Sequence, residues 1–261
     1  MAFVRYRADE REEASMLSSR MATTPGRFSN RPLYLQLRDA LAERIAQGEW
    51  KPGSAIPNES DLAREFGVSA GTMRKALDLM EAERLLTRRQ GRGTFVNDQS
   101  SDELAARFNN LRGADGSRVN GEIKAMEIAE AAASEAECAR LRLRAGDRVY
   151  RIARLRQHNG QVFLAEDVAL PAALFPGLAE RTNAADRIIV LAQEYGLLLG
   201  KAEERVSLGE ASPAVARSLG IAAGAPVLVL DRVVFSLDGR PLEWRIGRCH
   251  LKDKYYMAEM A

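Results

Sequence analysis

The stretch NESDLAREFGVSAGTMRKALDLM, residues 58–80, decides the fold of the first third of the chain. Asn58 is a typical helix N-cap with an acid three residues later, which predicts a short helix that ends at Gly67. Ser69 predicts the cap of a second helix. The apolar residues of that helix have the i, i+3, i+4, i+7 spacing of a buried face: Met73, Ala76, Leu77 and Met80. Two short helices joined by a tight turn that contains glycine form a helix-turn-helix pattern.

The residues on both sides of this stretch complete a small domain. Leucine or isoleucine recurs at every fourth position from Leu33 to Ile45, which predicts a further helix. Short strands are expected at 85–88 and 94–96, and the sequence RQGRG between them contains glycines that provide the positive φ of a tight hairpin. Three helices followed by a basic hairpin predict a winged helix-turn-helix over residues 31–97.

The other residues predict a tail, a linker and a second domain. Residues 1–30 combine polar and charged residues without apolar periodicity, which is typical of a flexible tail. The polar sequence that begins after residue 97 predicts a linker over 98–117. A second domain is then expected over 118–261.

Strands and helices are both expected in the second domain. The expected strands are 148–156, 161–170, 201–208, 227–236 and 241–250, and the expected helices are 134–141, 187–195 and 212–219. The dipeptides Asn159-Gly160 and Asp238-Gly239 each separate two expected strands, and both are strong signals of a tight hairpin. The pattern predicts an α+β domain with a mainly antiparallel sheet.

The composition excludes several classes of protein. With 261 residues, of which 46% are hydrophobic, the chain can form packed cores and is not fully disordered. Its apolar runs are far shorter than the ~20 residues of a membrane-spanning helix, and its start lacks the apolar core of a signal peptide. Two cysteines are too few for a disulfide framework. These features predict a cytoplasmic protein without a membrane partner.

The charge is distributed unevenly along the chain. The formal net charge of +2 would by itself argue against binding to nucleic acid. Residues 70–96, however, contain six basic and three acidic residues, which gives a local net charge of +3. Because local charge sets the electrostatic potential at a DNA surface, the helix-turn-helix and its hairpin are a candidate DNA-binding surface.

Short motifs in a fixed order point to a known family. The amino-terminal motifs are PLY at 32–34, KPG at 51–53, FGVS at 66–69 and RRQGRGTFV at 88–96. The carboxyl-terminal motifs are LFP at 174–176, YGL at 195–197, GAPVL at 224–228 and GRPLE at 239–243. Together they resemble the winged helix-turn-helix of the GntR superfamily of bacterial transcriptional regulators and the UTRA effector domain of its HutC branch. The resemblance implies a chorismate-lyase-like fold for the second domain.

Candidate DNA-binding residues lie at the start of the second helix of the helix-turn-helix and in the hairpin. The amino end of this helix is expected to enter the major groove, and the resemblance implies that the hairpin tip approaches the minor groove. The candidates are Ser69, Thr72, Arg74, Lys75, Arg88, Gln90, Gly91 and Arg92. Ser60 and Ala70 stand where relatives usually carry arginines, so the usual operator sequence of the family is not implied. Since one winged helix covers only half of a two-fold operator, a homodimer is expected.

Four charged residues are candidates for binding an effector. Arg154 and Arg156 alternate along one expected strand, so their side chains share a face of the sheet. Two like charges on a buried face require an anionic partner, which Glu166 and Glu243 can provide. All four match positions that line the effector pocket in relatives, and the resemblance implies an anionic or highly polar metabolite. A network of arginines and glutamates that binds no ligand is the alternative.

The expected function is ligand-controlled repression of transcription. An enzyme that acts on an anionic small molecule is the alternative, because the UTRA fold is similar to that of chorismate lyase. The sequence contains no Ser/Cys–His arrangement, metal-ligand spacing or phosphate-binding loop. No catalytic residue, metal site or cofactor is therefore expected. The expected partners are double-stranded DNA, a small-molecule effector and a second copy of the chain.

Overall fold

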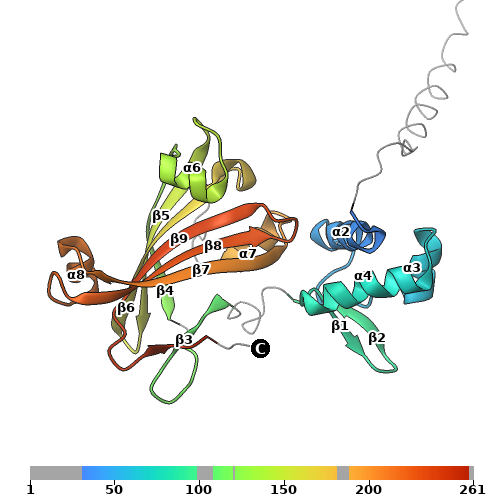
Figure 1. Ribbon diagram of the computed structural model, residues 1–261, viewed down its shortest axis with the longest axis horizontal. Coiled ribbons are helices and arrows are strands. Elements are labelled where there is room, and N and C mark those ends of the chain that lie inside the picture. Colours follow the sequence, from blue (N-terminus) through green and yellow to red (C-terminus); the bar gives the residue numbers. More distant parts are fainter. Residues whose placement is uncertain (1–30, 99–107, 120, 181–187, 259–261) are drawn as a thin grey trace, which may run out of the picture. The chain divides into compact units, whose positions relative to one another are not determined.

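A computed structural model describes residues 31–98, 108–119, 121–180 and 188–258 of the chain (Figure 1). The expected tail at 1–30 and residues 99–107 of the expected linker lie outside the described residues. The described residues form a winged helix-turn-helix and, later in the sequence, a larger α+β domain. None of the helices described is both long enough and apolar enough to cross a membrane.

Three helices and a hairpin form the winged helix-turn-helix. The helices are α2 (Leu33–Ala46), α3 (Glu59–Glu65) and α4 (Ala70–Ala82), and the hairpin consists of β1 (Leu86–Arg89) and β2 (Gly93–Val96). Both predicted caps are confirmed, because Asn58 Oδ1 accepts the Asp61 amide at 2.9 Å and Ser69 Oγ accepts the Thr72 amide at 3.2 Å. The core of this region includes the predicted apolar stripe of α4, and its most deeply buried side chains are Leu41, Leu62, Met73, Ala76 and Met80.

On both sides the paired strands extend one residue further toward the turn than expected, and the first strand begins at Leu86 instead of Leu85. Arg89 pairs with Gly93, so only Gln90, Gly91 and Arg92 remain in the turn. Gly91 and Gly93 have φ values of 68° and 108°. A residue with a Cβ atom is strained at these angles, so the two glycines make the short turn possible.

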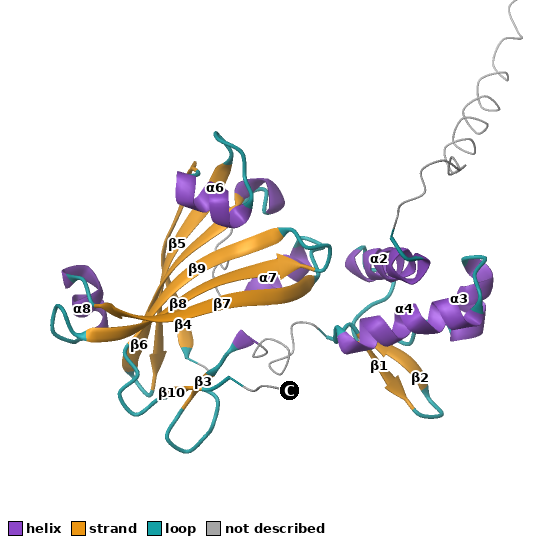
Figure 2. Ribbon diagram, in the orientation of Figure 1, coloured by secondary structure: helices purple, strands orange, loops and turns teal. Residues whose placement is uncertain are grey.

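A six-stranded antiparallel sheet organises the second domain (Figure 2). Its strand order is β4-β5-β6-β9-β8-β7. The strands are β4 (Glu122–Ala132), β5 (Arg148–His158), β6 (Gln161–Pro171), β7 (Leu199–Glu210), β8 (Pro226–Ser236) and β9 (Pro241–Cys249). The two predicted hairpins are confirmed, because Asn159-Gly160 joins β5 to β6 and Asp238-Gly239 lies between β8 and β9.

β4 is the long strand that the sequence did not predict. Its sequence, EIKAMEIAEAA, is rich in alanine and glutamate, which are depleted in strands. It pairs with β5 along its whole length, from Glu122 opposite Gln157 to Ala132 opposite Arg148. The backbone pairing with β5 therefore determines this strand, while its own side chains contribute little preference for it.

Part of the interval expected as a linker is ordered. Leu111–Arg112 forms the short strand β3, which pairs with β10 (Tyr255–Tyr256) near the other end of the domain sequence. Leu111 is buried and packs in one cluster with Leu164 and Cys249. The described residues from 108 to 117 are therefore packed as part of the second domain.

The two faces of the large sheet are covered differently. Helices α6 (Glu135–Leu141) and α8 (Pro213–Leu219) cover one face, where their leucines pack on side chains of β5, β6 and β8. The opposite face packs against η3 (Ala172–Leu174), η4 (Leu178–Glu180) and α7 (Ile188–Glu194). This second face also carries Arg154, Glu166, Arg232 and Arg245, and we call it the charged face.

Candidate functional site

The amino end of α4 forms part of the first candidate surface. Ser69 Oγ accepts the Thr72 amide and lies 2.8 Å from Thr72 Oγ1, so these two predicted contact residues are hydrogen-bonded to each other. The first turn of α4 contains no acidic residue, which leaves the partial positive charge of this helix end available to an anion. Met73 faces the core, and the residues that follow it point away from the core because each residue of a helix is rotated by about 100° from the one before. Arg74 and Lys75 are therefore exposed.

Arg74 is held against the preceding helix. Its Nη2 atom lies 2.8 Å from Glu59 Oε1, and its Nε atom donates to Glu59 Oε2 at 3.1 Å. The hydrogen bond and the charge of Glu59 both raise the pKa of the Arg74 guanidinium. Glu59 is the first residue of α3, so the pair fixes Arg74 between the two helices of the helix-turn-helix.

Arg88 lies at the base of the hairpin and contacts α4. Its Nη1 atom pairs with Asp78 and, at 3.2 Å, with Glu81. Its backbone amide also donates to Glu81 Oε1 at 3.0 Å. Because Asp78 and Glu81 both belong to α4, Arg88 connects the hairpin to this helix.

The turn of the hairpin exposes the remaining predicted residues. Gln90, Gly91 and Arg92 are all accessible to solvent. The Arg92 amide donates to the Arg89 carbonyl oxygen at 2.9 Å, which closes the turn. The Arg89 guanidinium lies 4.8 Å from the centroid of the Phe95 ring, a cation–π contact across the hairpin. The side chains of the turn therefore project from a well-supported hairpin.

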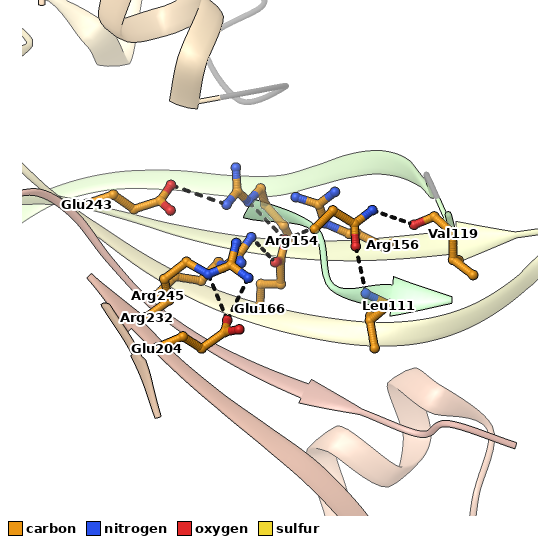
Figure 3. A network of polar contacts seen from close by, with 10 residues as sticks. Leu111, Val119, Arg154, Arg156, Glu166, Glu204, Arg232, Glu243 and Arg245 are labelled. Carbon is orange, nitrogen blue, oxygen red and sulfur yellow. Dashed lines mark hydrogen bonds and ion pairs between the residues drawn. The ribbon is translucent and has the colours of Figure 1, made fainter. Parts of the chain in front are cut away.

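A network of ion pairs on the charged face forms the second candidate site (Figure 3). Glu166 is its centre, with Arg245 Nη1 at 2.8 Å, Arg156 Nε at 3.0 Å and Arg154 Nε at 3.5 Å from its carboxylate oxygens. Arg154 Nη2 also lies 3.6 Å from Glu243 Oε2. The structure brings together all four residues predicted for the effector site and adds Arg245 to them.

The register of the sheet explains why these side chains meet. Arg154 on β5 lies opposite Glu166 on β6, and Arg245 on β9 lies opposite Arg232 on β8. Arg232 in turn lies opposite Glu204 on β7. Residues that are opposite each other in an antiparallel pair point to the same face, so the charges gather on one side of the sheet.

The network continues from Arg232 to the end of the domain. Arg232 Nε and Nη2 lie 2.7 and 2.6 Å from Glu204 Oε1. The Tyr256 hydroxyl donates to Glu204 Oε2 at 2.5 Å and accepts a hydrogen bond from Asn110 Nδ2 at 2.8 Å. Polar contacts thus connect the charged face to Asn110, close to the first described residues after residue 98.

The charges in this network are buried. Glu166, Arg154 and Arg245 expose 2%, 4% and 8% of their surface. Burial alone would raise the pKa of Glu166, but the charges of Arg156, Arg245 and Arg154 outweigh it and hold that pKa well below its usual range. Burial, together with the charge of Arg245, lowers the pKa of Arg232 to about 10. Glu166 is therefore ionised at neutral pH, and positive charge is crowded around it.

Arg232, Arg245 and Glu204 were not among the predicted site residues. Each lies on an expected strand, and Arg232 interrupts an apolar run in β8, which is a weak signal of a special role. Their contact with the predicted residues depends on the strand order β6-β9-β8-β7, which places β9 beside β6 although the two strands are far apart in the sequence. Alternation within one strand cannot predict that order.

The two regions together define a class of protein, in which a DNA-binding winged helix precedes a domain that senses a ligand. Residues 33–96 match the family described as bacterial regulatory proteins, gntR family, and residues 118–255 match the UTRA domain. The chain belongs to the GntR family, in the HutC-type branch that carries a UTRA domain.

Individual relatives agree with this assignment. The chain is 28% identical over 220 residues to the mannosyl-D-glycerate transport/metabolism system repressor MngR of Escherichia coli (strain K12), covering 83% of this chain and 91% of that protein. It is 31% identical over 210 residues to the histidine utilization repressor of Pseudomonas putida, covering 78% and 83%. The crystal structure of the ligand-binding domain of a GntR-family regulator from Bordetella bronchiseptica is similar with a TM-score of 0.54 and 28% identity, covering 59% and 98%.

These comparisons confirm the predicted fold class and the predicted kind of function. Matches to the GntR family and the UTRA domain agree with a winged helix-turn-helix joined to an α+β effector domain. The relatives are repressors of transcription and not enzymes. The protein is a ligand-responsive transcriptional regulator, and the alternative of an enzyme is not supported.

Proposed function

We propose that the protein is a cytoplasmic repressor that binds a two-fold operator as a homodimer and is controlled by a small anionic metabolite. The observation that carries the proposal is the cluster of arginines around Glu166 in a UTRA domain, together with a basic helix and hairpin in a GntR domain. The proposed divisions of the chain are a tail at 1–30, a DNA-binding domain at 31–97, a linker that begins at 98 and ends before residue 108, and an effector domain that includes the packed residues from 108 on.

The proposed DNA contacts follow from the positions of the predicted residues. The exposed end of α4 would place Arg74 and Lys75 in the major groove, with Ser69 and Thr72 near a phosphate. The turn at Gln90, Gly91 and Arg92 would reach the adjacent minor groove. Arg88 has a different part, because its contacts with Asp78 and Glu81 hold the hairpin in a fixed position relative to α4.

The proposed effector site contains Arg154, Arg156, Glu166 and Glu243. Arginine forks bind carboxylates and phosphates well, and they do so most strongly where water is excluded. The names of two relatives refer to mannosyl-D-glycerate and to histidine, and each of these compounds contains a carboxylate. A metabolite with an acidic group is the effector that these observations favour.

The contacts of Tyr256 support a route from the effector site toward the linker. Tyr256 joins Glu204, in the buried network, to Asn110, and the Met257 amide also donates to the Asn110 carbonyl oxygen at 2.8 Å. A ligand that displaces an arginine in the network would change these contacts. We propose that the change alters the linker and thereby the spacing of the two winged helices on the operator.

The DNA-binding half of the proposal is tested with an operator selected from a random duplex library. The selected sequences are expected to contain two inverted half-sites. The Arg74→Ala plus Arg92→Ala variant is expected to bind this operator at least about tenfold more weakly, since single base or phosphate contacts are worth ~1–3 kcal/mol. Affinity is measured by fluorescence anisotropy at moderate salt.

A matched variant controls for the loss of charge. Arg144→Ala plus Arg217→Ala removes two exposed arginines of the effector domain and is expected to bind the operator normally. An equal loss of affinity in both variants, or no loss in the first, would refute the proposed DNA contacts.

A further inference from the structure

We propose that Arg245 is an additional ligand-binding residue, and that it binds a carboxylate of the effector. The inference rests on the proposed function, because it names the chemical group that the effector site recognises. Arg245 on β9 belongs neither to the residues predicted from sequence nor to the strand pair β5–β6 that holds Arg154, Arg156 and Glu166.

The first observation is that positive charge exceeds negative charge on the charged face. The ion pairs described there join four arginines (Arg154, Arg156, Arg232 and Arg245) to three glutamates (Glu166, Glu204 and Glu243), which gives a net charge of +1. Buried charges are stable only when they are paired. One negative charge is therefore missing from the described part of this network.

The missing charge can be located within the network. Arg232 and Glu204 form a one-to-one pair with two contacts, so that part of the network is balanced. Three arginines converge on Glu166, and only Arg154 also approaches Glu243, at 3.6 Å. Among the described residues, the surplus positive charge therefore lies around Glu166, where three arginines share two carboxylates.

The second observation concerns Arg245 itself. Its Nη1 atom contacts Glu166 at 2.8 Å, while its Nε atom is buried and has no hydrogen-bond partner among the described residues. It also lies directly opposite Arg232, and like charges opposite each other in a sheet are unfavourable. Glu166, Glu243 and Glu204 nevertheless outweigh burial and raise the pKa of Arg245, so its guanidinium is fully charged. Arg245 therefore combines a full charge with a free donor.

The size of the surplus favours one kind of anion beside Arg245. A carboxylate carries one negative charge and would neutralise the surplus, whereas a phosphate monoester, with about −1.5 to −2 at pH 7, would exceed it.

The first test needs no ligand. If the charge of Arg245 is kept for a ligand, then Arg245→Gln removes an unbalanced buried charge and is expected to raise the midpoint of thermal unfolding by about 2–4 °C. The control is Arg232→Gln, which breaks a balanced pair and is expected to lower the midpoint by more than about 5 °C. A midpoint for Arg245→Gln that falls as far as that of Arg232→Gln would make Arg245 a structural partner of Glu166 and overturn the inference.

The second test uses defined anions. Acetate, lactate, glycerate and benzoate are compared with chloride and with inorganic phosphate at equal ionic strength. At least one carboxylate is expected to raise the midpoint of the unmodified protein by about 2 °C or more, and Arg245→Gln is expected to lose this increase. Stabilisation by phosphate alone, or by none of these anions, would overturn the assignment of a carboxylate.

A further variant separates failure of the inference from failure of the proposed effector site. Arg154→Gln is expected to lose the stabilisation as well, because Arg154 belongs to the proposed site. If Arg154→Gln loses the stabilisation and Arg245→Gln keeps it, the inference fails and the proposed site stands. If both variants keep it, both the inference and the proposed effector site fail.

Discussion

The arginines of the winged helix and those of the charged face form the same kind of ion pair in opposite surroundings. Arg74 is 65% exposed in its pair with Glu59, whereas Arg154 is 4% exposed beside Glu166. Water screens the first pair, so a DNA phosphate can replace its carboxylate at little free-energy cost. In the second pair, removal of either charge would leave the other one buried without a partner, which is strongly destabilising. The exposed arginines suit a polyanion, and the buried arginines suit the detection of a single added charge.

The largest effect is expected from removing a charge of the buried network. Glu166→Gln keeps the shape of the side chain but removes the carboxylate that three arginines share, and it is expected to reduce the free energy of unfolding by about 3–5 kcal/mol. Denaturant unfolding at pH 7 measures the change. Glu59→Gln is the matched control in the winged helix, and it is expected to leave the unfolding midpoint unchanged. Similar results for the two variants would remove the distinction between the regions.

A pair of intermediate exposure gives a pH-dependent effect. Hydrogen bonds from Arg151 and Ser134 hold the pKa of Glu137 at about 2, below its ordinary value of 4.5, although burial opposes them. The ionised carboxylate therefore stabilises the fold above about pH 4.5, and this contribution is lost as the pH falls toward 2. Glu137→Gln is expected to reduce stability by about 2 kcal/mol at pH 7, and by progressively less below pH 4.5.

Denaturant unfolding between pH 7 and pH 3 tests this expectation. Glutamine can still occupy the capping box of α6, so the variant isolates the charge of Glu137. Glu203→Gln removes an exposed carboxylate paired with Lys201 and is expected to be neutral throughout this range. A constant difference between Glu137→Gln and the unmodified protein at all pH values would contradict the assignment.

A smaller change in stability is expected for two equivalent helix caps, one in the winged helix-turn-helix and one in the second domain. Ser69 caps α4 and Ser212 caps α8 with the same hydrogen bond to the backbone. Replacing either with alanine is expected to reduce stability by about 1 kcal/mol. Only Ser69→Ala is expected to weaken operator binding as well, as measured by fluorescence anisotropy. Weaker DNA binding by Ser212→Ala would mean that affinity follows overall stability.

The smallest expected effect concerns the connection between the regions. Tyr256→Phe removes the hydroxyl that joins Glu204 to Asn110 and is expected to change operator affinity little in the absence of ligand. The effector-dependent release of DNA is expected to weaken by a few-fold, in the range of about 1 kcal/mol of coupling free energy. Operator titrations with and without a stabilising anion measure it. If the Tyr256→Phe variant releases DNA as fully as the unmodified protein does when the anion is added, the contacts of Tyr256 do not carry the signal from the effector site to the linker.

Sequence predicted those parts of the fold that local signals determine. Asn58 and Ser69 mark helix starts, and Gly91 and Gly93 mark the hairpin, because each of these residues acts on its immediate backbone. β4 was missed because alanine and glutamate carry no preference for a strand, and only its pairing with β5 makes it one.

The candidate effector site was predicted only in part for a similar reason. Arg154 and Arg156 alternate within one strand, so their shared face follows from sequence alone. Arg245 and Glu204 reach the same face through the order of strands β9, β8 and β7. No short sequence pattern predicts that order of strands, so the surplus of positive charge becomes apparent only in the folded domain.

The attachment of Arg88 to α4 has a consequence for how a regulator of this kind can be switched. Asp78 and Glu81 hold the hairpin through both the side chain and the backbone amide of Arg88, so the two parts proposed to contact DNA form one rigid unit. The distance between the proposed major-groove and minor-groove contacts of one subunit is then fixed. In the proposed homodimer, control by a small molecule is then left with the geometry between subunits, so the effector would change the spacing of the two winged helices and not the sequence that each of them reads.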